Sequence, residues 1–135
     1  MSAGTFRFLS VENVLLIHDD TLSEEGGLHA IRDLGLLESA VAMPQAMYGG
    51  EYLHHGLAEM AAAYLYHICQ NHAFVDGNKR TAAFACVLFL SHNGIPDERL
   101  PDEAALEKVT LNIASGKTAK SEAAEWLQQY APDQP

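Results

Sequence analysis

Two long apolar helical patterns, separated by a short polar segment, constrain this chain more than any other feature of its sequence. From residue 57 to residue 71, apolar residues fall on nearly every side of a helix, which is typical of an element buried at the centre of a domain. A second apolar pattern begins near Asn78 and ends at Asn93-Gly94. We therefore expect a hairpin of two buried helices at the centre of the fold.

Amphipathic spacing and helix-breaking residues predict further helices around this hairpin. They are a helix capped by Ser10 and ending before Gly26-Gly27, a short helix between Gly35 and Pro44, and helices at about 102–114 and 118–130. Strand signals are nearly absent, and the residues from Pro44 to Gly56 read as a loop or flap. The prediction is an all-α fold of five or six helices in one compact domain, with its core at about 8–130.

Composition narrows the class of protein. The chain has 135 residues, of which 48% are hydrophobic and 19% charged, as expected for one soluble globular domain. Eight Lys plus Arg against eighteen Asp plus Glu give a net charge of −10, which disfavours direct binding to nucleic acid or anionic lipid. We expect a cytoplasmic protein, because no secretory signal is recognisable and no apolar run approaches membrane-spanning length. Cys69 and Cys86 fall within apolar patterns and are expected to be reduced core residues.

The segment His72-Ala73-Phe74-Val75-Asp76-Gly77-Asn78-Lys79-Arg80 joins the two buried helices and concentrates reactive side chains. A helix that starts at Asn78 directs its unpaired N–H groups and positive dipole end at this loop. Gly77 lacks a Cβ, so an anion can approach the backbone closely and a positive φ is tolerated. Lys79 and Arg80 add a point charge and a fork of donors. The segment therefore predicts a phosphate site.

Three other residues of the segment suggest further roles. Asp76 can hold Mg²⁺ against phosphate oxygens, and a neutral His72 imidazole can accept a proton from an attacking hydroxyl. Phe74, apolar among polar neighbours, is interpreted as an anchor in the core. Each polar residue alone has a simpler interpretation as a helix cap or a surface ion pair. Their combination on one nine-residue segment favours a catalytic, phosphate-handling role over these simpler interpretations.

The pattern His-x-Phe-x-Asp-Gly-Asn-Lys-Arg at 72–80 resembles the signature of the Fic/Doc superfamily, and specifically of its death-on-curing (Doc) branch. The similarity extends to the Gly-Gly turn, to Arg32-Asp33, to Thr81-Ala82 and to residues 114–116. The family fold is a compact all-α domain, in agreement with the periodicity.

Members with Lys in this pattern are toxins that move the γ-phosphate of ATP to a protein hydroxyl. Their best-known target is elongation factor Tu, and an antitoxin from the adjacent gene covers their active-site groove. The resemblance implies an ATP- and Mg²⁺-dependent kinase that inhibits translation. Carried over by position, it implies His72 as general base, Asp76 in metal binding and orientation, and Gly77, Asn78, Lys79 and Arg80 in phosphate binding.

Two alternatives stay open. Fic proteins that transfer AMP carry Gly where Lys79 stands and a second Arg where this chain has Ala83. Both departures disfavour AMP transfer, although Gly77 matches the AMP-transferring pattern and the Doc prototype has Ala there. The other alternative, from a different class, is a catalytically silent binding module of the same fold.

The Gly- and Tyr-rich loop before the first buried helix carries weaker signals. We expect His54 and His55 to be exposed to solvent or to belong to a flap that docks a target protein. Tyr48 and Tyr52 flank Gly49-Gly50, which fits either such a flap or a turn packed by two rings.

Overall fold

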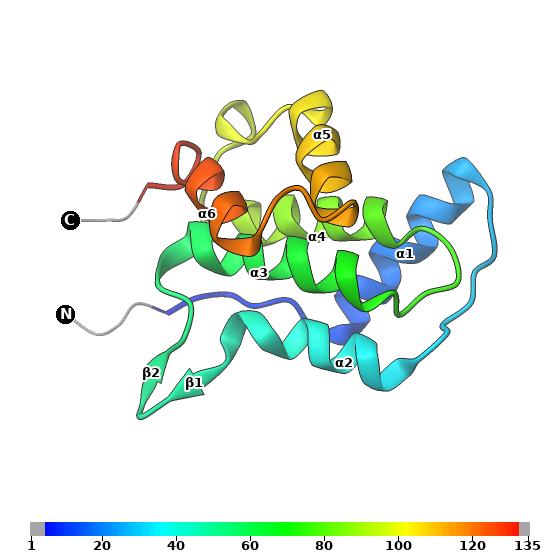
Figure 1. Ribbon diagram of the computed structural model, residues 1–135, viewed down its shortest axis with the longest axis horizontal. Helices are drawn as coiled ribbons and strands as arrows, with labels where there is room; N and C mark the ends of the chain where they lie inside the picture. Colours follow the sequence, from blue (N-terminus) through cyan, green and yellow to red (C-terminus); the bar gives the residue numbers. More distant parts are fainter. Residues whose placement is uncertain (1–4, 133–135) are drawn as a thin grey trace.

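The computed structural model describes residues 5–132 and confirms the all-α fold (Figure 1). These residues form six α-helices: α1 (Val11–Glu25), α2 (Leu34–Ala42), α3 (Gly56–Asn71), α4 (Asn78–His92), α5 (Glu103–Ala114) and α6 (Lys120–Gln128). Two 3₁₀ turns, η1 (Met43–Gln45) and η2 (Asp97–Arg99), and a small hairpin of β1 (Met47–Tyr48) and β2 (Glu51–Tyr52) complete the described elements. None of the described helices is both long and apolar enough to cross a membrane.

The expected central hairpin is formed by α3 and α4. Helix α3 lies in the middle of the molecule, with α4, α2, α5 and α6 packed around it (Figure 1). Its residues Ala58 and 60–65 are all at most 1% exposed, and the small side chains among them let neighbouring helices approach closely. Cys69 and Cys86 are free and buried, and burial raises the pKa of the Cys86 thiol to about 12. The expected reduced core cysteines are therefore confirmed.

Side-chain caps set the starts of three helices close to the expected positions. Ser10 and Asn13 form a reciprocal capping box at the start of α1, and Asp102 caps α5. Helix α2 begins at Leu34, before Gly35, because the Asp33 carboxylate accepts a hydrogen bond of 3.0 Å from the Leu36 N–H.

The region expected to be a loop or flap instead contains a β-hairpin. Met47 pairs with Tyr52 and Tyr48 with Glu51, in antiparallel register. Gly49 and Gly50 form the turn with φ of 59° and 82°, which suits a tight two-residue hairpin. Strands of two residues are too short to produce a visible alternation in the sequence.

This β-hairpin and the segment 72–77 lie at opposite ends of α3 (Figure 1). Tyr48 is 81% exposed, whereas Tyr52 packs against the rings of Phe6 and Phe8. Only one of the two tyrosines therefore packs the turn, and the turn is remote from the predicted phosphate site.

The expectation for His54 was wrong, because its side chain is only 7% exposed, whereas His55 is exposed. The Nε2 atoms of His54 and His67 each lie 3.1 Å from Nζ of Lys120. Lys120 is the first residue of α6, so the carboxyl-terminal helix closes over the connection between β2 and α3. Burial, reinforced by the Lys120 charge, lowers the pKa of both imidazoles, that of His67 to about 4.

Candidate functional site

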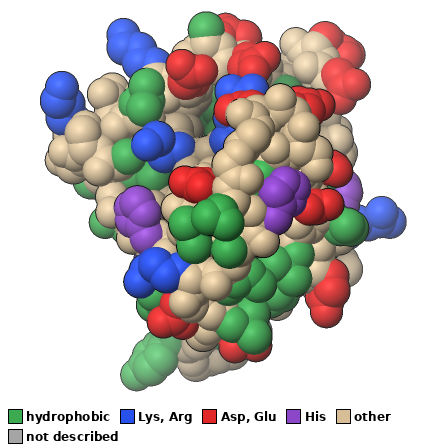
Figure 2. Space-filling view, turned by 90° about the vertical axis from the view of Figure 1, so that its right-hand side faces the viewer, with side chains coloured by type: hydrophobic (Ala, Val, Ile, Leu, Met, Phe, Trp, Pro, Cys, Tyr) green, Lys and Arg blue, Asp and Glu red, His purple; other side chains and the backbone are tan. Residues whose placement is uncertain are grey.

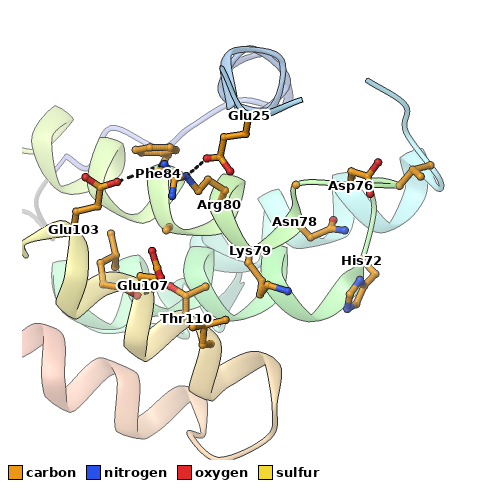
Figure 3. Close-up of a pocket in the computed structure, with 15 residues that line it drawn as sticks. Glu25, His72, Asp76, Asn78, Lys79, Arg80, Phe84, Glu103, Glu107 and Thr110 are labelled. Atoms are coloured by element: carbon orange, nitrogen blue, oxygen red, sulfur yellow. Dashed lines mark hydrogen bonds and ion pairs between the residues drawn. The ribbon is translucent and has the colours of Figure 1, made fainter. Parts of the chain in front are cut away.

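The segment between α3 and α4 opens onto a cavity of about 470 Å³ bounded also by α1 and α5 (Figure 3). The predicted residues that line it are His72, Asp76, Gly77, Asn78, Lys79 and Arg80. Other lining residues from α1, α4 and α5 are Glu25, Ala83, Phe84, Glu103, Leu106, Glu107, Thr110 and Leu111. Figure 2 views the molecule from this end, where acidic, basic and histidine side chains lie close to exposed hydrophobic ones. The structure thus brings the whole polar set of the motif to one cavity.

His72 ends α3 in the left-handed conformation, with φ 49° and ψ 49°. It is the only non-glycine residue with positive φ in the part of the chain that the structure describes. Glycine or asparagine usually occupies such a helix-ending position, because a Cβ is strained there. The imidazole is exposed to solvent at the cavity. A strained and exposed histidine points to a role for its side chain.

The amino end of α4 faces the cavity without a side-chain cap. Its N-cap is Gly77, with φ 81°. A Cβ on Gly77 would lie 3.1 Å from Cδ2 of Leu22 and 3.5 Å from Cδ2 of His18, so α1 also requires a glycine here. The N–H groups of the first turn of α4 are left for water or a bound anion, as in phosphate-binding helix termini.

The two cations of the motif differ in their surroundings. The Lys79 side chain is exposed, and its ammonium forms no hydrogen bond or ion pair with any other described residue. Arg80 forms ion pairs with Glu25 of α1 and, at 3.4 Å, with Glu103 of α5, and its guanidinium lies 5.5 Å from the centre of the Phe84 ring. In Figure 3 Arg80 extends toward these carboxylates, while His72 lies at the other end of the lining.

Asp76 and Asn78 are both held by backbone groups. Oδ2 of Asp76 accepts a hydrogen bond of 2.9 Å from the Leu28 N–H, which leaves Oδ1 for another partner. The Asn78 side-chain amide forms two hydrogen bonds with the backbone of Phe74. It accepts one of 3.0 Å from the Phe74 N–H and donates one of 2.9 Å to the Phe74 carbonyl. Asn78 therefore shapes the loop with its side chain, and its backbone N–H is left for an anion.

Two residues that support the loop were not assigned a function from the sequence. The His18 ring stacks on the Phe74 ring, with centroids 3.7 Å apart, and Nε2 of His18 lies 2.8 Å from the Asp76 carbonyl. Phe74 itself is 1% exposed. Arg32 contacts the end of α3 from the segment between α1 and α2. The position of His18 on the apolar stripe of α1 was the one sequence signal for its contact with Phe74.

Comparison with known proteins places these features in a family. The sequence model of the Fic/DOC family matches residues 8–90, from just before α1 almost to the end of α4. The chain belongs to the Fic/Doc family. The family match includes the whole of the 72–80 motif and the α1 contacts that support it.

Two curated Doc proteins resemble the chain. It is 33% identical over 123 residues to the protein kinase Doc of Escherichia phage P1, covering 91% of this chain and 94% of the relative. It is 50% identical over 70 residues to the toxin Doc of Mycolicibacterium smegmatis, covering 52% of this chain and 54% of the relative. The resemblance to the Doc branch is thereby confirmed, and the first of these similarities spans most of both chains.

Proposed function

We propose that this chain is a toxin of the Doc type that transfers the γ-phosphate of ATP to a hydroxyl of an elongation factor Tu-like protein and so inhibits translation. The names of the two relatives, a protein kinase and a toxin, support this assignment. Its expected partners are that translation factor and an antitoxin whose terminal segment covers the cavity. The expected cofactors are ATP and Mg²⁺.

The observation that carries the proposal is the left-handed conformation of His72 at the mouth of a cavity that contains an open helix amino end. The chain keeps a strained residue where glycine would fit better, so selection for the imidazole itself is the simplest explanation. A base at this point and an anion site opposite it are the two parts that phosphoryl transfer to a hydroxyl requires.

In this proposal the neutral His72 imidazole accepts the proton of the target hydroxyl as that oxygen bonds to the γ-phosphorus. The bond from the γ-phosphorus to the β,γ-bridging oxygen breaks at the same time, and ADP leaves. The N–H groups at the start of α4, from Gly77 to Lys79, bind phosphate oxygens together with the Lys79 ammonium. Arg80 binds phosphate as well, after exchanging one of its two carboxylate partners for the ligand. Asn78 contributes by holding the loop against Phe74.

The charges in the cavity fit a nucleotide bound with a metal ion. Its lining carries two cations, Lys79 and Arg80, against four carboxylates, those of Glu25, Asp76, Glu103 and Glu107, a balance of 2 − 4 = −2 with His72 neutral. A bare polyphosphate would be repelled by this balance. The free Oδ1 of Asp76 suits Mg²⁺, which typically takes one or two carboxylates along with phosphate and water oxygens. When bound, Mg²⁺ would neutralise phosphate charge.

AMP transfer of the Fic type is the second candidate, and one feature favours it. Gly77 at φ 81° matches the AMP-transferring pattern. Lys79 and Ala83 weigh against it, because the first occupies the path of the phosphates and the second removes a clamp. A catalytically silent binding module would leave the strain at His72 without a purpose.

An intact-mass measurement separates these functions. Purified chain is incubated with ATP, Mg²⁺ and elongation factor Tu, and the mass of the factor is recorded before and after. We expect a gain of one phosphate, and no gain with a His72→Ala variant. A gain of AMP would establish the second candidate, and no gain on any protein of a bacterial lysate would contradict both enzymatic functions.

A further inference from the structure

Arg32 lies outside the catalytic motif, yet it contacts the end of the helix that carries the proposed base. Its Nε donates a hydrogen bond of 2.7 Å to the His72 carbonyl, and one of its terminal nitrogens donates a bond of 3.2 Å to the Asn71 carbonyl. Its backbone N–H donates a third bond, of 2.7 Å, to the Ala73 carbonyl. One residue therefore binds three consecutive carbonyls around His72.

These carbonyls belong to the end of α3, where intrahelical donors are lacking. The last carbonyls of a helix also carry the negative end of its dipole, which a cation stabilises. A guanidinium satisfies both needs at once, because its planar fork can donate to two oxygens and its bonds are charge-assisted. His72 itself is the left-handed residue that ends α3, in the place that a Schellman glycine usually takes.

The surrounding segment extends this support along the whole loop. Ile31 and Phe74 form an antiparallel bridge, and the Val75 N–H donates a hydrogen bond of 3.0 Å to the Ala30 carbonyl. Arg32 is the member of this segment whose side chain reaches α3. The side chain itself is exposed and does not line the cavity, so its effect on the chemistry must pass through His72.

We propose that Arg32 is a positioning residue for the transfer reaction, which fixes His72 in its left-handed conformation and so aims the imidazole at the target hydroxyl. The proposal rests on the function assigned to His72 above. Without the guanidinium, the end of α3 can fray and residue 72 can relax to an unstrained conformation. The imidazole would then spend only part of its time in the reactive position.

The kinetic test compares Arg32→Ala with Arg99→Ala. Arg99 is an exposed arginine on η2 whose side chain has no hydrogen bond or ion pair within the described residues, so its loss should change nothing. For Arg32→Ala we expect kcat to fall by about 10- to 100-fold, the usual penalty for a misplaced catalytic group. KM for ATP should stay within about 2-fold, because Lys79 and the α4 amino end are untouched.

Chemical rescue distinguishes positioning from a general structural role. Millimolar guanidinium should restore kcat of the Arg32→Ala variant at least several-fold and leave wild type unchanged. If Arg32→Ala folds poorly, Arg32→Gln keeps part of the stem and one donor, and its kcat should fall between those of Ala and wild type. Wild-type kcat in Arg32→Ala, or a loss in a folded variant that guanidinium does not rescue, would overturn the proposal.

Hydrogen exchange tests the same contact without any reaction. In Arg32→Ala the backbone amides at 70–76 should exchange faster than in wild type, while those in the middle of α4 keep their protection. Unchanged exchange at 70–76 would overturn the proposal even if the wild-type chain proved to transfer nothing. Absence of transfer by wild type, with exchange altered as expected, would instead count against the proposed function alone.

Discussion

Replacing His72 by glycine and by alanine should separate stability from activity at the same position. Both changes remove the imidazole, and only glycine adopts φ 49° without strain. A left-handed L-residue costs about 1–2 kcal/mol, partly offset by the larger backbone entropy of glycine in the unfolded chain. The free energy of unfolding of His72→Gly should therefore exceed that of His72→Ala by about 1 kcal/mol.

Thermal and urea unfolding of the two variants measure this difference directly. For a domain of this size, 1 kcal/mol corresponds to about 4 °C in Tm. His72→Asn should lie between them, since asparagine tolerates the left-handed region better than alanine. All three should lose transfer activity by about 100-fold or more, as expected for removal of a general base.

Equal stability of the glycine and alanine variants would mean that residue 72 is not left-handed in solution, and the argument from strain would fail. Retained activity in the glycine variant would show that the imidazole is not the base. In the expected combination the glycine variant is more stable than the alanine variant and both lack activity, which separates the strain at residue 72 from the role of its imidazole.

Two further changes test the ion pairing of Arg80 and the burial of His67. Glu25→Gln should tighten ATP binding by about 2- to 5-fold in calorimetry, because Arg80 loses an exposed ion pair worth about 0.5–1 kcal/mol that competes with phosphate. Between pH 6.5 and about 4 the unfolded chain binds a proton at His67 that the folded chain excludes, so stability should fall as pH drops through this window and be complete above it. His67→Gln should remove about 1–3 kcal/mol of this loss in the free energy of unfolding, the full shift being reduced for partial exposure to solvent, and a curve of Tm against pH should be flatter in this window.

The Glu25→Gln prediction has a matched control. Glu24→Gln changes the charge of the neighbouring α1 residue, which does not contact Arg80 and should leave ATP affinity unchanged. An equal effect of both substitutions on ATP affinity would mean that the Glu25→Gln result comes from the change in net charge and not from the ion pair with Arg80. The histidine prediction fails if the pH curves of His67→Gln and wild type run parallel below pH 6.5.

Local patterns in the sequence were enough for the helices and for the motif residues that line the cavity. The apolar 57–71 pattern identified the buried helix α3, and Gly26-Gly27 marked the end of α1. The motif at 72–80 identified the loop that opens onto the cavity. These features depend on residues within a few turns of one another, which is the range that helical periodicity and capping rules describe.

The remaining features depend on contacts between residues far apart in the chain. Burial of His54 follows from Lys120 of α6, and the pairing of Arg80 follows from Glu25 of α1. Arg32 reaches a helix end some forty residues away. Such pairs leave no periodic signal, because each partner alone reads as an ordinary surface charge or loop residue.

The most direct test of the central claim follows the label from ATP. Purified chain, Mg²⁺ and elongation factor Tu are incubated with ATP that carries a radioactive label at either the α- or the γ-phosphate. The radioactivity in each protein band is then measured. We expect label on the factor from γ-labelled ATP only, and none with the His72→Ala variant. Label on the factor from α-labelled ATP would contradict this expectation. So would the absence of label from both forms of ATP in a bacterial lysate whose translation the chain arrests.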